Sequence, residues 1–326
     1  MPLRLLTSLL LTLCLPPIAH AAWLEQQTAI MGTNIHVKFW HEDKEKGEHL
    51  MQQSLERFHQ VDEQMSPYKA DSELSRINTE AYRHPVTVSA NLFALLQKSL
   101  QLSYLSHGAF DMTYASVGYL YDYRAGKMPD DKTIGENLSG INYRAVKLDA
   151  QTSSIRFLQE KTRIDLGGIA KGYAVDEVIK LLQQGGVTAA MVTAGGDSRI
   201  IGSKGDKPWI VGIKDPRQTD KPALLMPLEE TAISTSGDYE RFFIDEHQQR
   251  HHHILNPRTG KSPENGIQSV TILGPDATTT DGLSTTVFVL GLEQGLALVN
   301  RLPGIDAIII SQGGEIHYSE ELERLK

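Results

Sequence analysis

The chain has 326 residues, of which 40% are hydrophobic and 22% are charged, a balance typical of a folded globular protein and not of a disordered one. Its 32 Lys and Arg residues against 40 Asp and Glu residues give a formal net charge of −8 at pH 7, so the composition does not indicate a nucleic-acid-binding protein. It has one cysteine, which excludes an intramolecular disulfide framework.

Residues 1–21 have the pattern of a secretory signal peptide. One positive charge, Arg4, precedes an apolar stretch at 5–15, and residues 19–21, Ala-His-Ala, form an A-x-A cleavage site. The apolar stretch is too short to span a bilayer. We therefore expect cleavage after residue 21, a mature domain over 22–326 and a periplasmic location.

The position of the cysteine bears on how the chain would be exported. A lipoprotein signal needs a small residue before the modified cysteine, but Leu13 precedes Cys14, so lipid anchoring is the less favoured alternative. Removal of the signal also removes Arg4, which leaves 31 basic residues against 40 acidic ones and a net charge of −9. A mature chain without cysteine has no thiolate nucleophile and no thiolate metal site.

The first half of the mature chain mixes the two-residue alternation of strands with the spacing of helices. The predicted elements are a strand over 23–40 interrupted at Gly32, a helix over 47–64, a short helix capped by Asp71 or Ser72, a helix over 91–106, a hairpin over 144–157, the end of a strand at 162–166, and a helix over 173–183 that Gly185 and Gly186 stop.

The second half is mostly strands. The expected elements are strands at 189–195, 198–203, 209–214, 231–235, 241–246, 251–256 and 267–273, a helix rich in Thr and Ser, a helix over 292–302, and strands at 307–311 and 314–318. Clustered helices beside runs of short strands predict an α+β fold with mixed, largely antiparallel sheets, flanking helices and two closely joined lobes.

Several standard catalytic motifs are absent from the sequence. Gly167 and Gly172 have the spacing of a P-loop, but Tyr173 stands where that motif requires lysine. No G-x-G-x-x-G follows a strand, and neither G-x-S-x-G nor H-E-x-x-H occurs. The three adjacent histidines at 251–253 are not expected to share a zinc ion, because neighbouring strand residues point to opposite faces.

Residues 276–291, DATTTDGLSTTVFVLG, place many hydroxyl and carboxylate oxygens before an apolar run. Asp281, Ser284 and Thr285 have i, i+3, i+4 spacing, which predicts that they share one face of the first helical turn. Helix capping would explain residues of these types. The alternative is that the three oxygen donors hold a hard cation that carries a phosphate. Spacing alone leaves both interpretations open.

Residues 164–178, IDLGGIAKGYAVDEV, predict a strand end, a glycine turn and a helix start. Such glycines suit a place where the backbone closely approaches another group. A tight strand-to-helix turn is the alternative explanation. HGAFDMT at 107–113 and HILNPRTG at 253–260 are, taken singly, only turns.

Seven short motifs follow one another along the chain: MGT, SPYKADSEL, HGAFDMT, DLGGIAKGYAVD, AGGD, HILNPRTG and TDGLSTT. In this order, from about Met31 to the end, they resemble the ApbE family, the FAD:protein FMN transferases. The resemblance implies an ApbE-like α+β fold. It also implies an enzyme that uses Mg2+, takes FAD as substrate, places FMN on a Thr or Ser hydroxyl of a target protein and releases AMP.

The resemblance also implies roles for single positions. The implied metal ligands are the backbone carbonyl of Ala170 and the side chains of Asp281, Ser284 and Thr285. The implied flavin-binding residues are Met31, Tyr68, Ala109, Phe110, Asp111, Gly167, Tyr173 and Leu255. His253 is implied in proton transfer, which would make it catalytic together with Asp281, and Lys171 is a further candidate for contact with phosphate.

The targets implied by the resemblance are flavoprotein subunits of membrane electron-transport complexes of the sodium-pumping quinone reductase type. Their acceptor sites face the outside of the cytoplasmic membrane, which suits the predicted export and would allow peripheral membrane association. Nucleic acid is not an expected partner. Two alternatives remain, a Mg2+-dependent FAD pyrophosphatase that yields FMN and AMP, and a periplasmic FAD-binding protein without turnover.

Overall fold

The computed structural model describes residues 21–218 and 220–325, so the predicted signal peptide, apart from Ala21, lies outside the described residues. An eight-stranded sheet forms the centre, in the order β1-β2-β6-β7-β10-β13-β14-β15, and all of its neighbouring strands are antiparallel. These strands are β1 Ala22–Ile30, β2 Thr33–His41, β6 Ala190–Ala194, β7 Asp197–Ile201, β10 Ala232–Gly237, β13 Ile267–Gly274, β14 Asp306–Ser311 and β15 Ile316–Tyr318.

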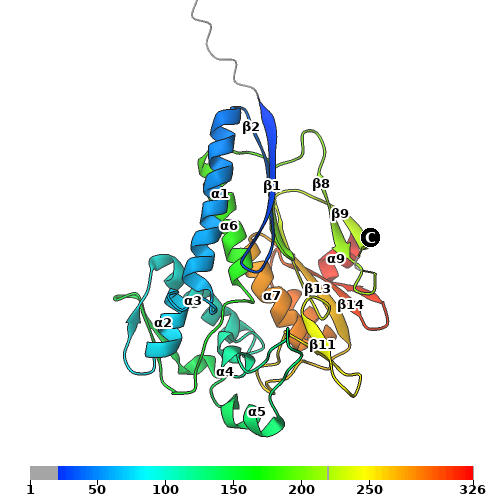
Figure 1. Cartoon of the computed structure of the whole chain (residues 1–326). Coiled ribbons are helices and arrows are strands. Elements are labelled where there is room, and N and C mark those ends of the chain that lie inside the picture. The colour runs from blue at the N-terminus through cyan, green and yellow to red at the C-terminus, as the bar shows by residue number, and fades with distance from the viewer. Residues whose placement is uncertain (1–20, 219, 326) are drawn as a thin grey trace, which may run out of the picture.

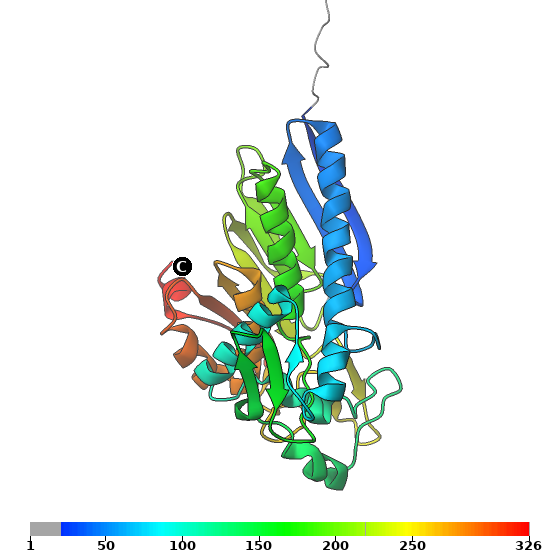
Figure 2. The same cartoon turned by 90° about the vertical axis from the view of Figure 1, so that its left-hand side faces the viewer.

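Helices cover one face of this sheet (Figures 1 and 2). The helices are α1 Lys44–Met65, α2 Glu73–Glu80, α3 Ala90–Leu105, α4 Ala115–Gly118, α5 Asp131–Leu138, α6 Ala170–Gln184, α7 Ala277–Leu290, α8 Leu292–Val299 and α9 Glu320–Arg324. The long helices α1, α6 and α7 pack in turn on β1–β2, β6–β7 and β10–β13. A single main cluster of buried apolar side chains joins helices and sheet. The predicted α+β fold is therefore confirmed.

Three smaller sheets complete the fold. They are β3 Val86–Thr87 with β5 Ser154–Phe157 and β4 Val146–Asp149, β8 Trp209–Lys214 with β9 Pro222–Leu228, and β11 Phe242–Ile244 with β12 Arg250–His252. The β8–β9 hairpin buries Trp209 and Leu228 against the second face of the large sheet. All eight residues of β13 are consequently buried, because α7 covers one face of the strand and the hairpin covers the other.

One sequence prediction is wrong, and one strand was not predicted. No strand ends at 162–166, because the backbone there bonds to side chains instead of a ladder: Ile164 N–H donates to Asn78 Oδ1 at 2.8 Å, and Asn78 Nδ2 donates to Ile164 O at 2.9 Å. The strand that was not predicted is β9, which contains Pro222 and Pro227. It pairs only with β8, and an edge strand tolerates proline.

No helix in the described part of the chain combines the length and apolar character needed to cross a bilayer. The other predicted helices and strands lie within a few residues of their observed positions. Ser72, one of the two predicted caps, does cap α2, since its side chain accepts a hydrogen bond from Ser75 N. Gly32 lies in the turn between β1 and β2, at φ 67°, where the predicted strand is interrupted.

Candidate functional site

The N-terminal part of α6 lies directly against the N-terminal part of α7. A Cβ atom on Gly172 would lie 2.1 Å from the carbonyl oxygen of Ala277 and 2.8 Å from Asp281 Cβ, so this position admits only glycine without movement of a backbone. The Gly172 amide donates a hydrogen bond to Asp281 Oδ2 at 3.0 Å. The glycine turn and the Thr/Ser-rich segment, far apart in sequence, thus meet at one place.

Two carboxylates cap the start of α7. Asp276 is the N-cap, and its side chain accepts from Thr279 N at 2.7 Å. Asp176 reaches across from α6 and accepts from Ala277 N at 2.9 Å and Thr278 N at 2.7 Å. The capping interpretation therefore holds for the first residues of the segment, and these caps satisfy amides that have no partner within the helix.

Asp281 is not a cap. It is the fifth residue of α7, so the expectation that it lies in the first helical turn is wrong by about one turn. Its side chain is almost fully buried, with 2% of the residue exposed. The helix begins at Ala277 because Asp276 takes the capping position, and Asp281 consequently lies in the second turn.

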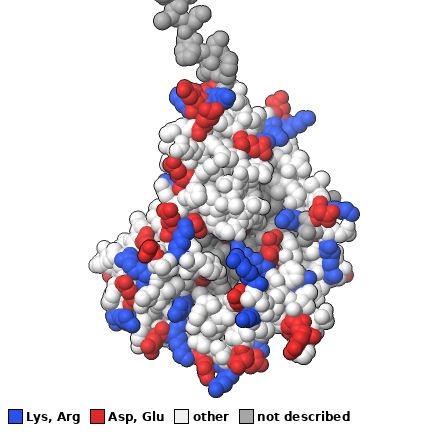
Figure 3. Space-filling view, in the orientation of Figure 1, with Lys and Arg blue, Asp and Glu red and all other residues white. Residues whose placement is uncertain are grey.

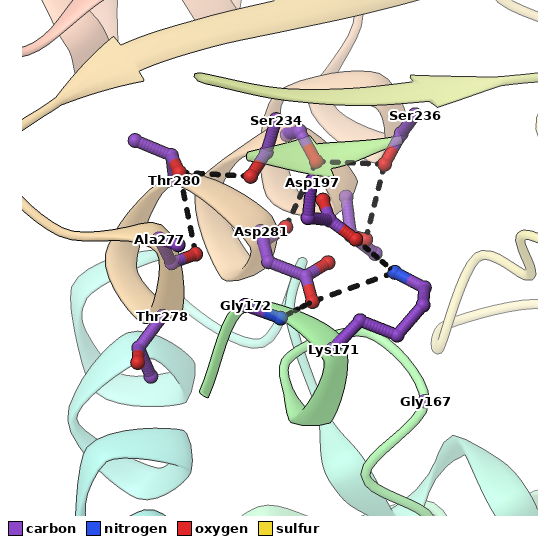
Figure 4. A network of polar contacts seen from close by, with 12 residues as sticks. Gly167, Lys171, Gly172, Asp197, Ser234, Ser236, Ala277, Thr278, Thr280 and Asp281 are labelled. Carbon is purple, nitrogen blue, oxygen red and sulfur yellow. Dashed lines mark hydrogen bonds and ion pairs between the residues drawn. The ribbon is translucent and has the colours of Figure 1, made fainter. Parts of the chain in front are cut away.

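Asp281 forms a buried ionic group with Lys171 of α6 and Asp197 of β7 (Figure 4). Lys171 Nζ lies 3.5 Å from Asp281 Oδ2 and forms a second, shorter ion pair with Asp197. Burial and then the Asp197 charge raise the pKa of Asp281 to about 7, and the two carboxylates hold the pKa of Lys171 well above its usual range. Two carboxylates share one ammonium, so the group can accept another positive charge.

Hydroxyl groups lie near Asp281 on α7 and on the neighbouring strand β10. Ser236 Oγ on β10 is 2.8 Å from Ser284 Oγ and 3.4 Å from Thr285 Oγ1. Ser284 Oγ also donates to the Asp281 carbonyl at 2.8 Å. The predicted ligands on α7 therefore lie together, and Ala170 is the first residue of the facing helix α6. Carboxylate and hydroxyl oxygens suit a hard cation, so these residues fit Mg2+.

Such a cation would take few of its ligands from charged side chains. Within residues 21–218 and 220–325, no three His, Cys, Asp or Glu side chains are grouped so that they could hold a metal ion. His251 Nε2 contacts Asp245 Oδ2 at 2.9 Å, whereas the neighbouring His252 ring lies edge-on to Phe288. A hard ion in this position would complete its coordination with hydroxyls, backbone carbonyls, water or substrate phosphate.

His253 and Arg241 form another part of the site. His253 N donates to Arg241 O at 3.0 Å, and His253 Nδ1 lies 3.3 Å from the same oxygen. A carbonyl can only accept, so Nδ1 carries the hydrogen and Nε2 has the free lone pair. Burial, the Arg241 charge and further neighbours including Lys171 lower the pKa of His253 to about 4, which keeps the imidazole neutral at pH 7.

The opening of the site is basic and accessible. The Arg241 guanidinium is exposed and lies 3.4 Å from Gly32 O, in the turn that also contains Met31 at φ 56°. Figure 3 shows a recess near the centre of this face with Lys or Arg side chains at its margin. Over the rest of the face acidic and basic side chains are interspersed. Arg241 gives this opening an exposed positive charge that would attract an anionic ligand.

An exposed aromatic ring lies near the glycine turn. Tyr68, between α1 and α2, is 89% exposed. Tyr114 donates from its hydroxyl to Asp165 Oδ1 at 3.1 Å, and Asp165 also accepts from Gly167 N at 2.6 Å. Burial raises the pKa of Tyr114 well above its usual value, and Tyr68 adds to that effect, so the two tyrosines are close. A ring left open to this degree is suited to stacking on a planar ligand.

The other predicted flavin residues have structural partners. Phe110 is 4% exposed and belongs to the main core, although its ring lies 3.4 Å from the position that a Cβ on Gly168 would occupy. Asp111 accepts hydrogen bonds from Thr113 N at 2.8 Å and Tyr143 N at 3.0 Å. Ala109 and Leu255 are buried, and Tyr173 is half-buried against the main core. Their flavin-binding roles stay predictions.

Sequence reasoning missed four residues that belong to this site or its support: Asp176, Asp197, Ser236 and Arg241. A sequence signal existed for Asp197, which ends the motif AGGD. Asp176 likewise ends the motif DLGGIAKGYAVD. For Ser236 and Arg241 no motif was available, because each acts through a partner more than 10 residues away in the chain.

Comparison with known proteins gives the following similarities. The model of the ApbE family matches residues 31–309. An FAD:protein FMN transferase of Treponema pallidum (strain Nichols) is 35% identical over 263 residues, which are 76% of this chain and 72% of that protein. Another of Klebsiella pneumoniae (strain 342) is 32% identical over 291 residues, 88% of this chain and 89% of that protein.

Solved structures show the same similarity in three dimensions. The crystal structure of an ApbE protein from Thermotoga maritima has a TM-score of 0.85 and 33% identity, with 93% of this chain and 99% of that chain covered. The structure of a flavin transferase ApbE from Vibrio cholerae has a TM-score of 0.82 and 27% identity over the same shares of the two chains.

Proposed function

This chain belongs to the ApbE family, and on that premise we propose that it is an FAD:protein FMN transferase that depends on Mg2+. It transfers FMN from FAD to a Thr or Ser hydroxyl of a target protein and releases AMP. One observation carries the proposal: the buried carboxylates of Asp281 and Asp197 share the Lys171 ammonium, close in the fold to the Ser284 and Thr285 hydroxyls and to a neutral histidine.

The reaction requires that a pyrophosphate approach this group. Two carboxylates and one ammonium would repel it on their own, so a further cation is needed. Asp281 and Thr285 would hold a magnesium ion, with Ser284 and the Ala170 carbonyl as further ligands, and that ion would neutralise charge on the pyrophosphate. Lys171, held by Asp197, adds a fixed positive charge, and Arg241 adds another at the opening.

His253 moves the proton. Its Nε2 lone pair accepts the hydrogen of the acceptor hydroxyl while the hydroxyl oxygen forms a bond to the FMN phosphorus. The bond between that phosphorus and the bridging oxygen breaks, and AMP leaves with the electron pair. The hydrogen bond from Nδ1 to the Arg241 carbonyl holds the imidazole in the tautomer that leaves Nε2 free.

The direct test uses the purified mature chain with FAD, Mg2+ and the acceptor domain of a target flavoprotein. A transferase yields flavin fluorescence on the acceptor band of a denaturing gel, and chelation of the metal abolishes it. Free FMN and AMP without labelled acceptor would identify a pyrophosphatase. Intact FAD after incubation would identify a binding protein, and either result overturns the proposal.

The flavin ring is proposed to stack on Tyr68. Tyr68→Ala should weaken FAD binding by about 1–3 kcal/mol, as for other lost aromatic stacking, with no change in thermal stability because the ring is 89% exposed. Phe110→Ala should instead lower stability by about 3–5 kcal/mol, since it removes a core ring. Titration of FAD into each variant measures the effect on FAD binding, and thermal melting measures the effect on stability. Unchanged FAD affinity in Tyr68→Ala would contradict the stacking.

We further propose export through cleavage of the signal at residues 1–21 and action on flavoprotein subunits of membrane electron-transport complexes. The A-x-A pattern at 19–21 supports the proposed export. Mass spectrometry of the protein from its native compartment should show an N-terminus at Ala22 or Trp23. A lipid-modified Cys14 at the N-terminus would show instead that the chain is membrane-anchored.

A further inference from the structure

The small sheet β11–β12 has one edge without backbone partners. In this antiparallel pair Arg241 O accepts from His253 N, and Asp245 N donates to Gln249 O. Hydrogen-bonded pairs alternate along such a ladder, so the N–H and C=O groups of the residues between them, at 242 and 244, point outward. Within residues 21–218 and 220–325, no group accepts or donates a hydrogen bond to them.

The two edges of the sheet differ in their protection. On β12, Ser262 Oγ accepts from His252 N at 3.1 Å and donates to His252 O at 2.7 Å, so a side chain closes that edge at His252. On β11, no side chain among the described residues bonds in this way to the backbone of Phe242 or Ile244, which are 37% and 52% exposed. Soluble proteins commonly protect an edge with lysine, proline or a bulge, and β11 has none of these.

Ring contacts attach the hairpin to the rest of the protein. Phe243, between the two exposed residues, stacks on His251 with 5.1 Å between ring centroids, and its ring centroid lies 6.0 Å from that of Tyr123. The His252 ring lies against Phe288 of α7 at 5.3 Å. Figure 1 shows β11 in yellow in the lower half of the molecule. A preordered edge binds a strand at lower entropic cost than a mobile loop does.

The N-terminal end of the β11 edge lies close to the proposed reaction centre. Arg241 immediately precedes β11 and contacts the turn at Gly32, and after burial its charge is a further cause of the lowered pKa of His253. Strand β12 ends at His252, next to His253. A polypeptide laid along β11 toward Arg241 would therefore run toward the opening of the site, with Arg241 between it and His253.

The charged side chains beside β11 indicate which kind of segment would bind there. Arg250 stacks on the Phe242 ring at 3.9 Å from its centroid, and Arg241 precedes the same residue in the chain. Of the nearby carboxylates, Glu240 pairs with Lys214 at 3.8 Å, Asp238 is buried, and Asp245 and Glu246 contact His251 and His247. Two exposed guanidinium groups beside Phe242 and Ile244 fit an extended segment with apolar side chains and a carboxylate.

We propose that the β11 edge is the docking site for the acceptor segment of the target flavoprotein, which adds to it as a strand. The segment is extended, carries apolar side chains on the face toward Phe242 and Ile244, and has an acidic residue close to the acceptor Thr or Ser. Main-chain hydrogen bonds give affinity in this mode of binding, and the side chains give specificity. This inference rests on the proposed transferase function.

The test compares Ile244→Pro with Ile244→Val. Proline removes the outward N–H and is tolerated at a strand edge, whereas valine keeps the N–H and an apolar, β-branched side chain. With the acceptor domain as substrate, Ile244→Pro should raise KM for the acceptor about tenfold or more, because a strand cannot pair across proline, and KM should stay within about twofold of wild type in Ile244→Val. FAD affinity and thermal stability should match wild type in both.

The outcomes are distinguishable. An unchanged acceptor KM in Ile244→Pro, with an active wild type, overturns the docking site. Loss of FAD affinity in Ile244→Pro also overturns it and places β11 in the flavin site. Sedimentation that shows dissociation of a dimer in Ile244→Pro at unchanged KM would assign the edge to a second copy of the chain. Absence of any FMN transfer by the wild type is a separate result that refutes the proposed function itself.

Discussion

Asp281→Asn should abolish FMN transfer while the protein stays folded. The amide keeps the shape of the carboxylate and still offers an oxygen to the Gly172 amide, now 3.0 Å from Oδ2, so the α6–α7 contact should persist. The variant loses the charge that would hold a hard dication. We expect transfer to fall by a factor of at least about 10², the scale of losses when charge stabilisation of a transition state is removed. The fall in FMN transfer is measured by flavin labelling of an acceptor across a Mg2+ titration.

Asp276→Asn is the matched control. Asp276 is the N-cap of the same helix, and Asn is among the best N-cap residues, so both activity and stability should remain close to wild type. The two substitutions are chemically identical and five residues apart. If Asp281→Asn kept full activity with unchanged Mg2+ dependence, the carboxylate would have no role with the metal.

Local patterns predicted the elements that support this site. Apolar spacing placed α1, α3 and α6 to within a few residues, because one stripe of each helix packs on the sheet or the core. The interruption predicted at Gly32 corresponds to the turn between β1 and β2, where a positive φ favours glycine. These features depend on neighbours in sequence, which is why sequence reasoning could find them.

Features that depend on distant partners could not be predicted. The pairing of Lys171 with Asp197 exists only because α6 packs on β7, and the second cap of α7 comes from Asp176 on another helix. The hairpin edge at Phe242 depends on which strand of a pair has its backbone closed by Ser262. No spacing within the chain encodes such relations.

The motif HGAFDMT shows what a resemblance leaves open. Its residues are expected to contact flavin, and that expectation stays a prediction. In the structure Asp111 accepts hydrogen bonds from Thr113 N and Tyr143 N, and burial raises the pKa of its carboxyl. Phe110 packs in the core. A shared motif can reflect a shared turn as well as a shared ligand contact, and the sequence alone does not separate the two.

Gly172→Ala should destabilise the protein and impair transfer together. The added Cβ would lie 2.1 Å from Ala277 O and 2.6 Å from Ala277 C, and these backbone atoms cannot move away without shifting α7. Overpacking of this kind costs about 1–3 kcal/mol. The shift would also lengthen the 3.0 Å hydrogen bond that holds Asp281 against α6 and would misplace its carboxylate. Denaturant unfolding and acceptor labelling at low temperature measure the two effects.

Gly135→Ala provides the control for helix propensity. Gly135 is exposed in α5, and a Cβ there meets nothing within 4 Å, so alanine should stabilise the helix by about 0.5–1 kcal/mol and leave activity unchanged. The same substitution thus changes stability in opposite directions at the two positions. If Gly172→Ala were as stable and as active as Gly135→Ala, the α6–α7 approach would be wider than described, and the buried carboxylate would not owe its position to the glycine turn.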